Sequence, residues 1–222
     1  MIQNKHMICS LLFDLDNTLY SEATGLENGV AQRINLFIAD FFGLSISEAI
    51  RVRREHAKAY GTTLEWLMRD YGFQEPEEYF RAIHPEDEAD CLNPDMVLKL
   101  ILNNIPLPKA VLTNAPMDHA IRILDKLGIS ECFSGIYDIW FNKLVGKPHP
   151  GSYLGVLEAS GFTLEHTLFI DDLPRYVKGY IDIGGLAVLK DEMDRFSDLP
   201  FRRLKTIYEL DQILDQLNSS YI

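Results

Sequence analysis

The chain has 222 residues, of which 47% are hydrophobic and 24% charged, and its 33 acidic and 21 basic side chains give a formal net charge of −12. This length suffices for one large domain, or for a domain with a smaller insertion, and for a substantial buried core. The acidic balance argues against a nucleic-acid polymer as the main partner, because such binding depends on clustered Lys and Arg.

The first predicted element is a strand over residues 7–13, whose continuous apolar run is typical of a parallel strand covered on both faces. It leads into the stretch LLFDLDNTLY, in which Asp14 and Asp16 follow the apolar run. Residues two apart on a strand point the same way, so both carboxylates should converge at the edge where open α/β sheets bind ligands. Two like charges held close require a cation, a shared proton or both. The alternative is an Asx-type turn with solvated acids.

Residues 20–93 form a predicted all-helical block. Its amphipathic segments, with turn or capping residues between them, cover 27–43, 45–61, 62–73 and 76–83. A helical block inserted directly after the first strand leaves the carboxyl end of that strand facing the insertion. We therefore interpret residues 20–93 as a cap domain, and residues 1–19 together with 94–222 as an α/β core.

From residue 93 onward, helical and strand patterns alternate. Helices are predicted at 93–105, 118–129, 150–162 and 175–185, strands at 109–115, 135–141, 166–172 and 186–189, and a final helix within 207–222. This alternation predicts a doubly wound, Rossmann-like parallel sheet.

Three further strand ends or loops carry polar residues that a packed core does not require. Thr113 and Asn114 end one apolar run before a helix whose first N–H groups suit an anion, although a simple helix cap would also explain them. Lys147 lies between a glycine and a proline, and the alternative for it is a solvated lysine. Asp171 and Asp172 end a second buried strand. Two strands that each deliver paired carboxylates to one sheet edge are hard to explain without a metal.

The order of these residues resembles the four motifs of the haloacid dehalogenase-like hydrolase superfamily. The motifs span almost the whole chain and read Asp14-x-Asp16-x-Thr18, Thr113-Asn114, Lys147-Pro148 and Asp171-Asp172. The resemblance implies a phosphatase in which Asp14 is the nucleophile and Asp16 the general acid and base. Asp16 must then begin protonated, to assist the leaving oxygen, before its carboxylate activates water. Thr113 would hold the transferring phosphoryl group and Lys147 would neutralise charge.

The same resemblance implies a Mg²⁺ site. Asp171 and Asp172 would hold the ion together with Asp14 and the backbone carbonyl of Asp16. Oxygen ligands of these types suit Mg²⁺, which also accepts substrate oxygens and water. A carboxylate that attacks a phosphate dianion must overcome repulsion, and the metal and a lysine lower that barrier by neutralising charge. Leu173 stands where the superfamily often has Ser or Thr.

Within the superfamily, the sequence is most similar to the pyrimidine 5′-nucleotidase group. The narrower likeness rests on Asn17, Tyr20, the Tyr60-Gly61 pair and Asn114, and it implies substrate contacts for Asn17, Tyr20, Tyr60 and Asn114. Each also has a structural explanation: Tyr60 could pack the cap, Gly61 could end a helix and Asn114 could cap the next one. The implied substrate is a small phosphorylated metabolite, a pyrimidine nucleoside 5′-monophosphate, with phosphoglycolate or a sugar phosphate as alternatives.

Other activities of the same fold stay open. A dehalogenase would need Asp14 but would have no use for Asp16 or for the second acid pair. A phosphomutase shares every motif and differs only in delivering an acceptor hydroxyl in place of water. A phosphate-ligand binding module would be expected to have lost at least one catalytic residue, whereas all of them are present here.

The cysteines and the first residues give an expectation about location. Cys9, Cys91 and Cys132 are widely spaced and odd in number, so they indicate neither a disulfide framework nor a zinc site. Residues 1–16 lack the features of a signal peptide, and no apolar run approaches the length of a membrane span. We therefore expect a soluble cytoplasmic protein with no membrane partner.

Overall fold

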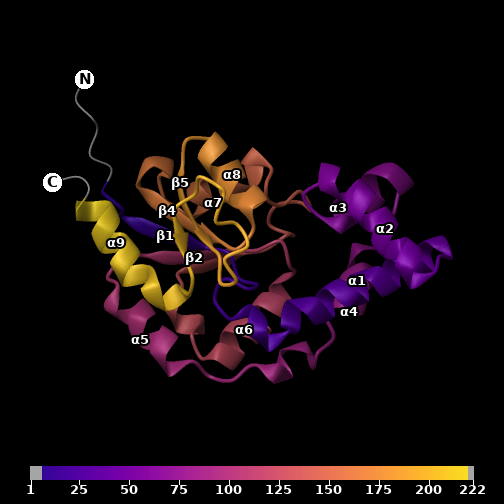
Figure 1. Cartoon of the computed structure of the whole chain (residues 1–222), viewed down its shortest axis with the longest axis horizontal. Helices are drawn as coiled ribbons and strands as arrows, with labels where there is room; N and C mark the ends of the chain where they lie inside the picture. Colours follow the sequence, from indigo (N-terminus) through magenta and orange to yellow (C-terminus); the bar gives the residue numbers. More distant parts are fainter. Residues whose placement is uncertain (1–6, 220–222) are drawn as a thin grey trace.

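Six parallel strands form the centre of the molecule in the computed structural model, which describes residues 7–219 (Figure 1). The strands are β1 (Ser10–Phe13), β2 (Lys109–Leu112), β3 (Gly135–Tyr137), β4 (Thr167–Asp171), β5 (Leu186–Lys190) and β6 (Arg203–Leu204). Their order across the sheet is β3-β2-β1-β4-β5-β6, and every neighbouring pair is parallel. The prediction of a doubly wound parallel sheet is therefore confirmed. The order reverses between β1 and β4, which is where such sheets bind ligands.

Helices cover both faces of the sheet. The helices that pack on the sheet are α5 (Met96–Asn104), α6 (Met117–Leu127), α7 (Pro150–Ser160), α8 (Pro174–Asp182) and α9 (Leu210–Ser219). Figure 1 shows α7 and α8 on one side of the sheet and α5, α6 and α9 on the other. In β1, Leu11 and Phe13 pack with α5, α6 and α9, whereas Leu12 packs with α7 and α8. All four residues of β1 are buried, because a central strand has a helical layer on each side.

A helical insertion fills the chain between β1 and α5. It runs from the 3₁₀ turn η1 (Glu22–Thr24) to the 3₁₀ turn η3 (Glu88–Cys91) and contains α1 (Leu26–Phe42), α2 (Ile46–His56), the turn η2 (Ala57–Ala59), α3 (Thr63–Tyr71) and α4 (Pro76–Ile83). Gly43 ends α1 in the left-handed region, and Ser45 and Glu48 form a capping box at the start of α2. Figure 1 shows α1 to α4 projecting from one end of the sheet.

The strands differ from the predictions in length and in number: the strand predicted over 7–13 begins at Ser10, and that predicted over 109–115 ends at Leu112. The predicted strand over 135–141 ends at Tyr137, because the Asp138 carboxylate accepts hydrogen bonds from the backbone N–H groups of Met117 and Phe141 and turns the chain. Strand β6 was not predicted, since two residues are too short to show a pattern. The rest of the alternation is confirmed, although residues 1–6 and 220–222 of the predicted core lie outside the described residues.

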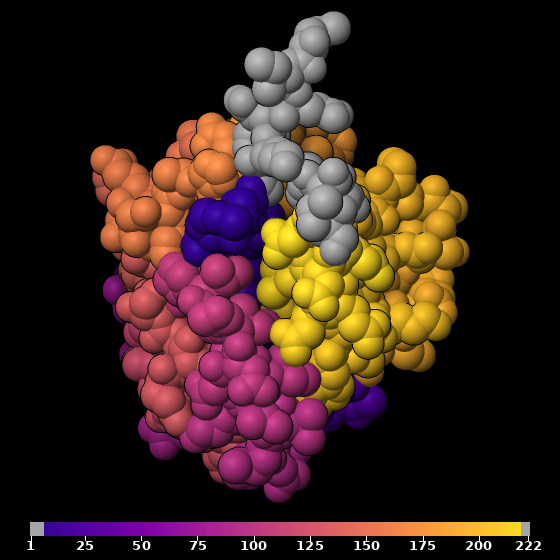
Figure 2. Space-filling model, turned by 90° about the vertical axis from the view of Figure 1, so that its left-hand side faces the viewer, coloured from indigo at the N-terminus to yellow at the C-terminus, as the bar shows by residue number. Residues whose placement is uncertain are grey.

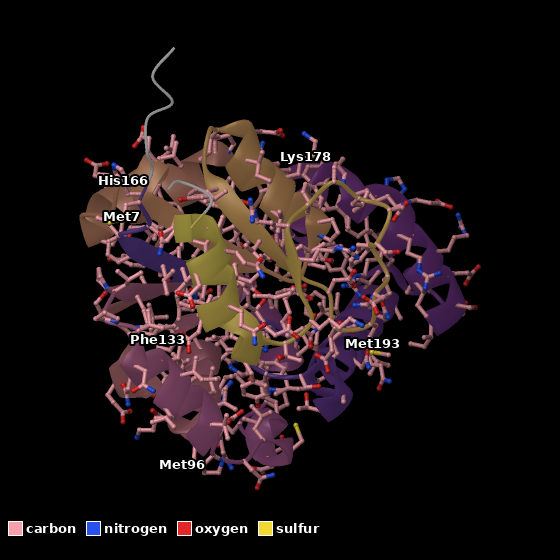
Figure 3. All side chains as sticks on the ribbon, turned by 60° about the vertical axis from the view of Figure 1, so that its left-hand side comes forward. Met7, Met96, Phe133, His166, Lys178 and Met193 are labelled. Carbon is pink, nitrogen blue, oxygen red and sulfur yellow. The ribbon has the colours of Figure 1, made fainter. Side chains whose placement is uncertain are left out.

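Segments far apart in the sequence close the other end of the sheet. The Tyr208 hydroxyl donates to Asp95 just before α5, and Figure 2 shows the yellow C-terminal region beside the magenta segment that contains α5. The His166 ring lies 3.0 Å from the backbone oxygen of Met7, which joins the entry of β1 to the turn before β4 (Figure 3). None of the helices between residues 7 and 219 combines the length and the apolar character that a membrane crossing requires.

Candidate active site

Lys147 joins the two acid pairs at the carboxyl ends of β1 and β4. Its Nζ donates hydrogen bonds to Asp14 Oδ1 at 2.5 Å and to Asp171 Oδ2 at 2.7 Å. Asp14 follows β1, Asp171 is the last residue of β4, and Lys147 reaches them from the loop before α7. The alternative of a solvated lysine is wrong, because Lys147 is 0% exposed.

The protonation of this group follows from its burial and its charges. Burial alone lowers the pKa of Lys147, but Asp14 and Asp171 outweigh it and raise that pKa above the usual range, so the side chain stays a cation. The pKa of Asp14 is raised to about 7, chiefly by burial and further by the negative charges of Asp171 and Asp16, while Lys147 opposes the rise. Thr18 Oγ1 donates to the other oxygen of Asp14 at 3.0 Å.

Asp172 completes a cluster of three buried carboxylates. One carboxylate oxygen from each of Asp14, Asp171 and Asp172 lies within 4.8 Å of the others. Asp172 is 7% exposed, and no residue between 7 and 219 donates a hydrogen bond to its carboxylate. Burial, followed by the charges of Asp171 and Asp14, raises the pKa of Asp172 well above its ordinary value. Lys147 contacts two of these three carboxylates, Asp14 and Asp171, but not Asp172, and such a set of hard oxygen donors fits Mg²⁺.

Asp16 has different partners. Its Oδ1 accepts a hydrogen bond from the Tyr20 hydroxyl at 2.7 Å and lies 2.8 Å from Nε2 of His119. Burial alone raises the pKa of Asp16, but the positive charge of His119 and these hydrogen bonds outweigh it and lower that pKa. The pKa of His119 is raised to about 10, because Asp16 and Glu88 together outweigh its burial. Both shifts favour the proton on His119, whereas the mechanism that the resemblance implies needs it on Asp16 when the leaving oxygen departs.

Thr113 and Asn114 follow β2. The Thr113 hydroxyl accepts a hydrogen bond from the backbone N–H of Ala115 at 3.0 Å. The Asn114 amide accepts from the backbone N–H of Lys147 at 2.8 Å and donates to the Lys147 carbonyl at 3.0 Å, so it fixes the lysine loop. A Cβ on Gly146 would lie 2.1 Å from the Asn114 side-chain oxygen, which is why the loop has glycine there. Asn114 does not cap α6, whose N-cap residue is Pro116.

A cavity of about 260 Å³ lies between these strand ends and the helical insertion. Six of the sequence-predicted site residues line it: Asp14, Asp16, Asn17, Thr113, Asn114 and Asp172. The insertion contributes polar groups to the same wall, namely Glu27, Arg53, Thr62, Thr63 and Tyr79. The cavity therefore has a floor of carboxylates and other polar groups from the ends of the strands, and a mixed polar and apolar roof from the insertion.

The aromatic residues suggested for substrate contact lie elsewhere. Tyr60 is half-buried and its hydroxyl donates to Asp70 at 2.5 Å, whereas Tyr20 is buried and donates to Asp16. Neither is among the residues of the described chain that line the cavity. Gly61 does not end a helix in the left-handed region: a Cβ there would lie 2.7 Å from the Lys147 carbonyl oxygen, so its role is a close approach of insertion and core.

Sequence reasoning missed five ionisable residues: Glu27, Arg53 and Arg175 line the cavity, and His119 and Glu88 lie behind Asp16. Burial, aided by the charge of Asp16, raises the pKa of Glu27 to about 8. Arg53 is fixed by Thr63 at 3.2 Å and by Asn35 at 3.1 Å. All lie within helical patterns or turns that explain them as ordinary surface or core residues, so no local signal could have found them.

Comparison with known proteins identifies relatives of the chain. A family model described as haloacid dehalogenase-like hydrolase matches residues 10–179. Phosphate metabolism protein 8 of Saccharomyces cerevisiae is 27% identical over 186 residues, which cover 78% of this chain and 58% of that protein. (S)-2-haloacid dehalogenase of Xanthobacter autotrophicus is 31% identical over 137 residues, which cover 59% of this chain and 49% of that protein. The chain thus spans about half of the length of these curated relatives.

Solved structures resemble the fold over nearly the whole chain. The HAD phosphatase from Thermococcus onnurineus has a TM-score of 0.63 at 19% identity and covers 93% of this chain and 98% of its own. The β-phosphoglucomutase from Clostridium difficile has a TM-score of 0.60 at 18% identity and covers 96% and 99%. At these identities the likeness concerns the fold alone.

Proposed function

The chain belongs to the haloacid dehalogenase-like hydrolase family, and from that premise we propose that it is a Mg²⁺-dependent phosphatase that hydrolyses a small phosphate monoester. The observation that carries the proposal is one cavity lined by Asp14, Asp16 and Asp172, with Lys147 bonded to Asp14. A dehalogenase would use the nucleophile but would have no use for the second carboxylate or the buried acid pair.

The metal would be held by Asp14, Asp172 and the backbone carbonyl of Asp16. Both oxygens of Asp171 already accept hydrogen bonds, one from Lys147 and one from the backbone N–H of Leu173 at 2.8 Å. Asp171 is therefore better suited to orient the lysine, and Asp172 to contact the ion directly. Bound Mg²⁺ would supply the positive charge that lets a carboxylate approach a phosphate dianion.

In the first step, an Asp14 oxygen forms a bond to phosphorus and the ester bond to the leaving oxygen breaks. Lys147 neutralises part of the negative charge gathered there, and the Thr113 hydroxyl, which still has its own hydrogen, can donate it to a phosphoryl oxygen. The Asp16–His119 pair shares one proton. Asp16 passes this proton to the leaving oxygen.

In the second step, Asp16 acts as a carboxylate and takes a proton from water. That water attacks the phosphorus of the aspartyl-phosphate, inorganic phosphate leaves and the Asp14 carboxylate is restored. A phosphomutase would pass the phosphoryl group to a hydroxyl of a second substrate instead of to water, so release of inorganic phosphate separates the two reactions.

We further propose that residues 20–93 act as a cap that selects the leaving group. The support is the position of Glu27, Arg53, Thr62 and Thr63 over the floor of the cavity. These groups can hydrogen-bond the ring of a pyrimidine nucleoside 5′-monophosphate, and a cap that closes tightly on that ring would disfavour a larger purine by shape. Arg53 favours phosphoglycolate as an alternative substrate, since a fixed guanidinium can pair with its carboxylate.

The test is phosphate release with Mg²⁺ from UMP, CMP, AMP, GMP, phosphoglycolate and a sugar phosphate, expressed as kcat/KM under one set of conditions. Asp14→Asn is the control, because the amide cannot form the acyl-phosphate while the steric change is small, and we expect it to have essentially no turnover. Wild-type turnover in that variant would sink the phosphatase mechanism. Equal handling of purines and pyrimidines, or a preference for phosphoglycolate, would remove only the nucleotidase assignment.

A further inference from the structure

A buried chain of charged groups lies behind Asp16 and reaches into the helical insertion. His119, in α6, is fully buried, and its Nε2 lies 2.8 Å from Asp16 Oδ1. Its Nδ1 lies 2.6 Å from Oε1 of Glu88, in η3, whose side chain is also fully buried. Because both ring nitrogens contact carboxylate oxygens, both carry hydrogen and the ring donates at each end.

The same residues could be mistaken for a metal site. Ligand atoms of His84, Glu88 and His119 lie within 4.8 Å of one another. However, Arg122 Nη2 donates to Glu88 Oε1 at 2.8 Å, and Arg33 Nη2 lies 3.6 Å from Glu88 Oε2. A metal cation here would meet two guanidinium groups, so the cluster is built to hold the Glu88 carboxylate and not an ion.

The chain of contacts fixes the orientation of the Asp16 carboxylate. Its Oδ1 has two partners, the Tyr20 hydroxyl and His119, whereas no residue of the described chain donates to Oδ2. The Asp16 side chain is 20% exposed and lines the cavity. Oδ2 is thus the oxygen available to a substrate, and the contacts on Oδ1 decide where it sits.

Glu88 anchors this arrangement from the insertion side. It is bonded to His84 at the end of α4 at 2.9 Å, and it faces Arg33 of α1. From the core, α6 supplies both His119 and Arg122. The position of His119 therefore depends on how the insertion packs on α6, because Glu88 contacts both. The position of Asp16 depends on it in turn, through its contact with His119.

We propose that His119 and Glu88 are positioning residues for Asp16, which hold its Oδ2 toward the leaving oxygen of the substrate. The inference rests on the proposed function, in which Asp16 protonates that oxygen. It makes a specific demand on the kinetics: misplacing Asp16 should slow poor leaving groups, which need a proton, far more than good ones, which do not.

The experiment compares kcat/KM for p-nitrophenyl phosphate, phenyl phosphate and an alkyl phosphate, because this ratio reports the steps up to cleavage of the ester bond. The variants are His119→Leu, which removes both donors, and His119→Gln, whose amide can still donate toward Asp16. For His119→Leu we expect a loss of about 10- to 100-fold on the alkyl phosphate, which is part of the roughly 10²- to 10⁴-fold that general acid catalysis contributes, and a loss of about threefold or less on p-nitrophenyl phosphate. His119→Gln should recover part of the alkyl activity.

Glu88→Gln keeps the test valid if His119→Leu does not fold, because it disturbs the contact between Glu88 and His119 without touching Asp16. It should change the dependence on the leaving group in the same direction as His119→Leu, by a smaller factor. Ser10→Ala is the matched control: it removes a buried hydrogen bond of 2.8 Å to Thr167 at the opposite end of β1. The control should leave the dependence on the leaving group unchanged.

Equal losses on all three substrates, with only a lower Tm, would assign His119 and Glu88 a structural role and overturn the inference. Asp14→Asn separates this failure from that of the proposed function. If Asp14→Asn is inactive while the His119 and Glu88 variants keep the wild-type dependence on the leaving group, only the positioning role is lost. If Asp14→Asn keeps full turnover, the proposed function fails as well.

Discussion

Lys147 is the cation that bonds the carboxylates at the ends of both β1 and β4. It is fully buried, it bonds Asp14 and Asp171, and its Nζ lies 5.0 Å from the centre of the Tyr176 ring. Removing one partner of a buried ion pair leaves the other charges uncompensated, and this costs more than the pair contributes when intact. We therefore expect a change at Lys147 to affect both stability and the proposed reaction.

We expect Lys147→Met, which keeps the length but removes the charge, to lose about 3 kcal/mol or more of transition-state stabilisation, on the scale of one preorganised electrostatic partner. The unfolding free energy should also fall, since Asp14 and Asp171 lose their shared cation. Steady-state kinetics and urea unfolding measure the two effects. Lys178→Met, at an exposed pair with Asp182, is the control and should change neither. A change confined to KM would mean that Lys147 acts only in binding.

Glu88 predicts a pH dependence of stability. Burial alone raises the pKa of Glu88, but hydrogen bonds from His119 and His84 and their charges lower it below the usual range. When the pKa of a carboxyl group is lower in the folded than in the unfolded protein, the group stabilises the fold at every pH above its unfolded-state pKa. This stabilisation disappears as the pH falls from the unfolded-state pKa through the folded-state pKa. The difference in unfolding free energy between wild type and Glu88→Gln should therefore be largest near pH 7 and should shrink as the pH falls below about 4.5. Urea titrations at several pH values measure it, and a difference that grows toward acid would contradict the assignment.

At the scale of elements, the sequence predicted what depends on local pattern. The helix ending at Gly43, the buried run before Asp14 and the acid pair at the end of β4 all follow from periodicity and turn residues close in sequence. The contact between Asp16 and His119 joins residues 103 positions apart, and that between Glu88 and His119 joins residues 31 apart. Such pairs depend on how α6 packs beneath the insertion, which the pattern of one helix cannot specify.

The loop before α3 provides a prediction about how insertion and core meet. The Gly61 carbonyl accepts hydrogen bonds from Arg175 at 2.9 Å and from the Tyr176 hydroxyl at 3.1 Å, and a Cβ would lie 2.7 Å from the Lys147 carbonyl oxygen. We expect Gly61→Ala to push the two segments apart and to lower both kcat/KM and Tm. Enzyme assays and thermal unfolding measure this change.

The matched control is Gly155→Ala inside α7, where the nearest atom to the added Cβ is Phe141 Cε1 at 3.9 Å. Alanine in an open helix interior stabilises by about 0.5–1 kcal/mol, so Tm should rise slightly with kcat/KM unchanged. If Gly61→Ala leaves kcat/KM and Tm as unaffected as Gly155→Ala does, the close contact at Gly61 matters neither for activity nor for stability.

At the scale of the whole molecule, the protein is an acidic chain that buries three carboxylates in one cluster. An ion that binds only the folded state stabilises it by about 2.7 kcal/mol at a hundred times its Kd. We therefore expect saturating Mg²⁺ to raise Tm by about 5–10 °C, given about 2–4 °C per kcal/mol for a chain of this size. A chelator should reverse the shift and abolish turnover.

Asp172→Asn distinguishes this site from weak surface binding. It removes one of the repelling charges and a proposed ligand, so its Tm without metal should equal or exceed that of the wild type, and Mg²⁺ should no longer raise it. A wild-type Mg²⁺ shift in this variant would count against direct binding by Asp172.

The central position of β1 also bears on the synthesis of the protein by the ribosome. β1 is made before its sheet neighbours, and its pairing partner in β4 follows 157 residues after Ser10. At about 5–20 residues per second, this strand waits about 8–30 s before the sheet can close around it. The insertion, whose contacts are more local, can fold during that interval, while the apolar segment that precedes Asp14 stays available to chaperones. The carboxylates at the ends of β1 and β4 therefore come together only after β4 has been made.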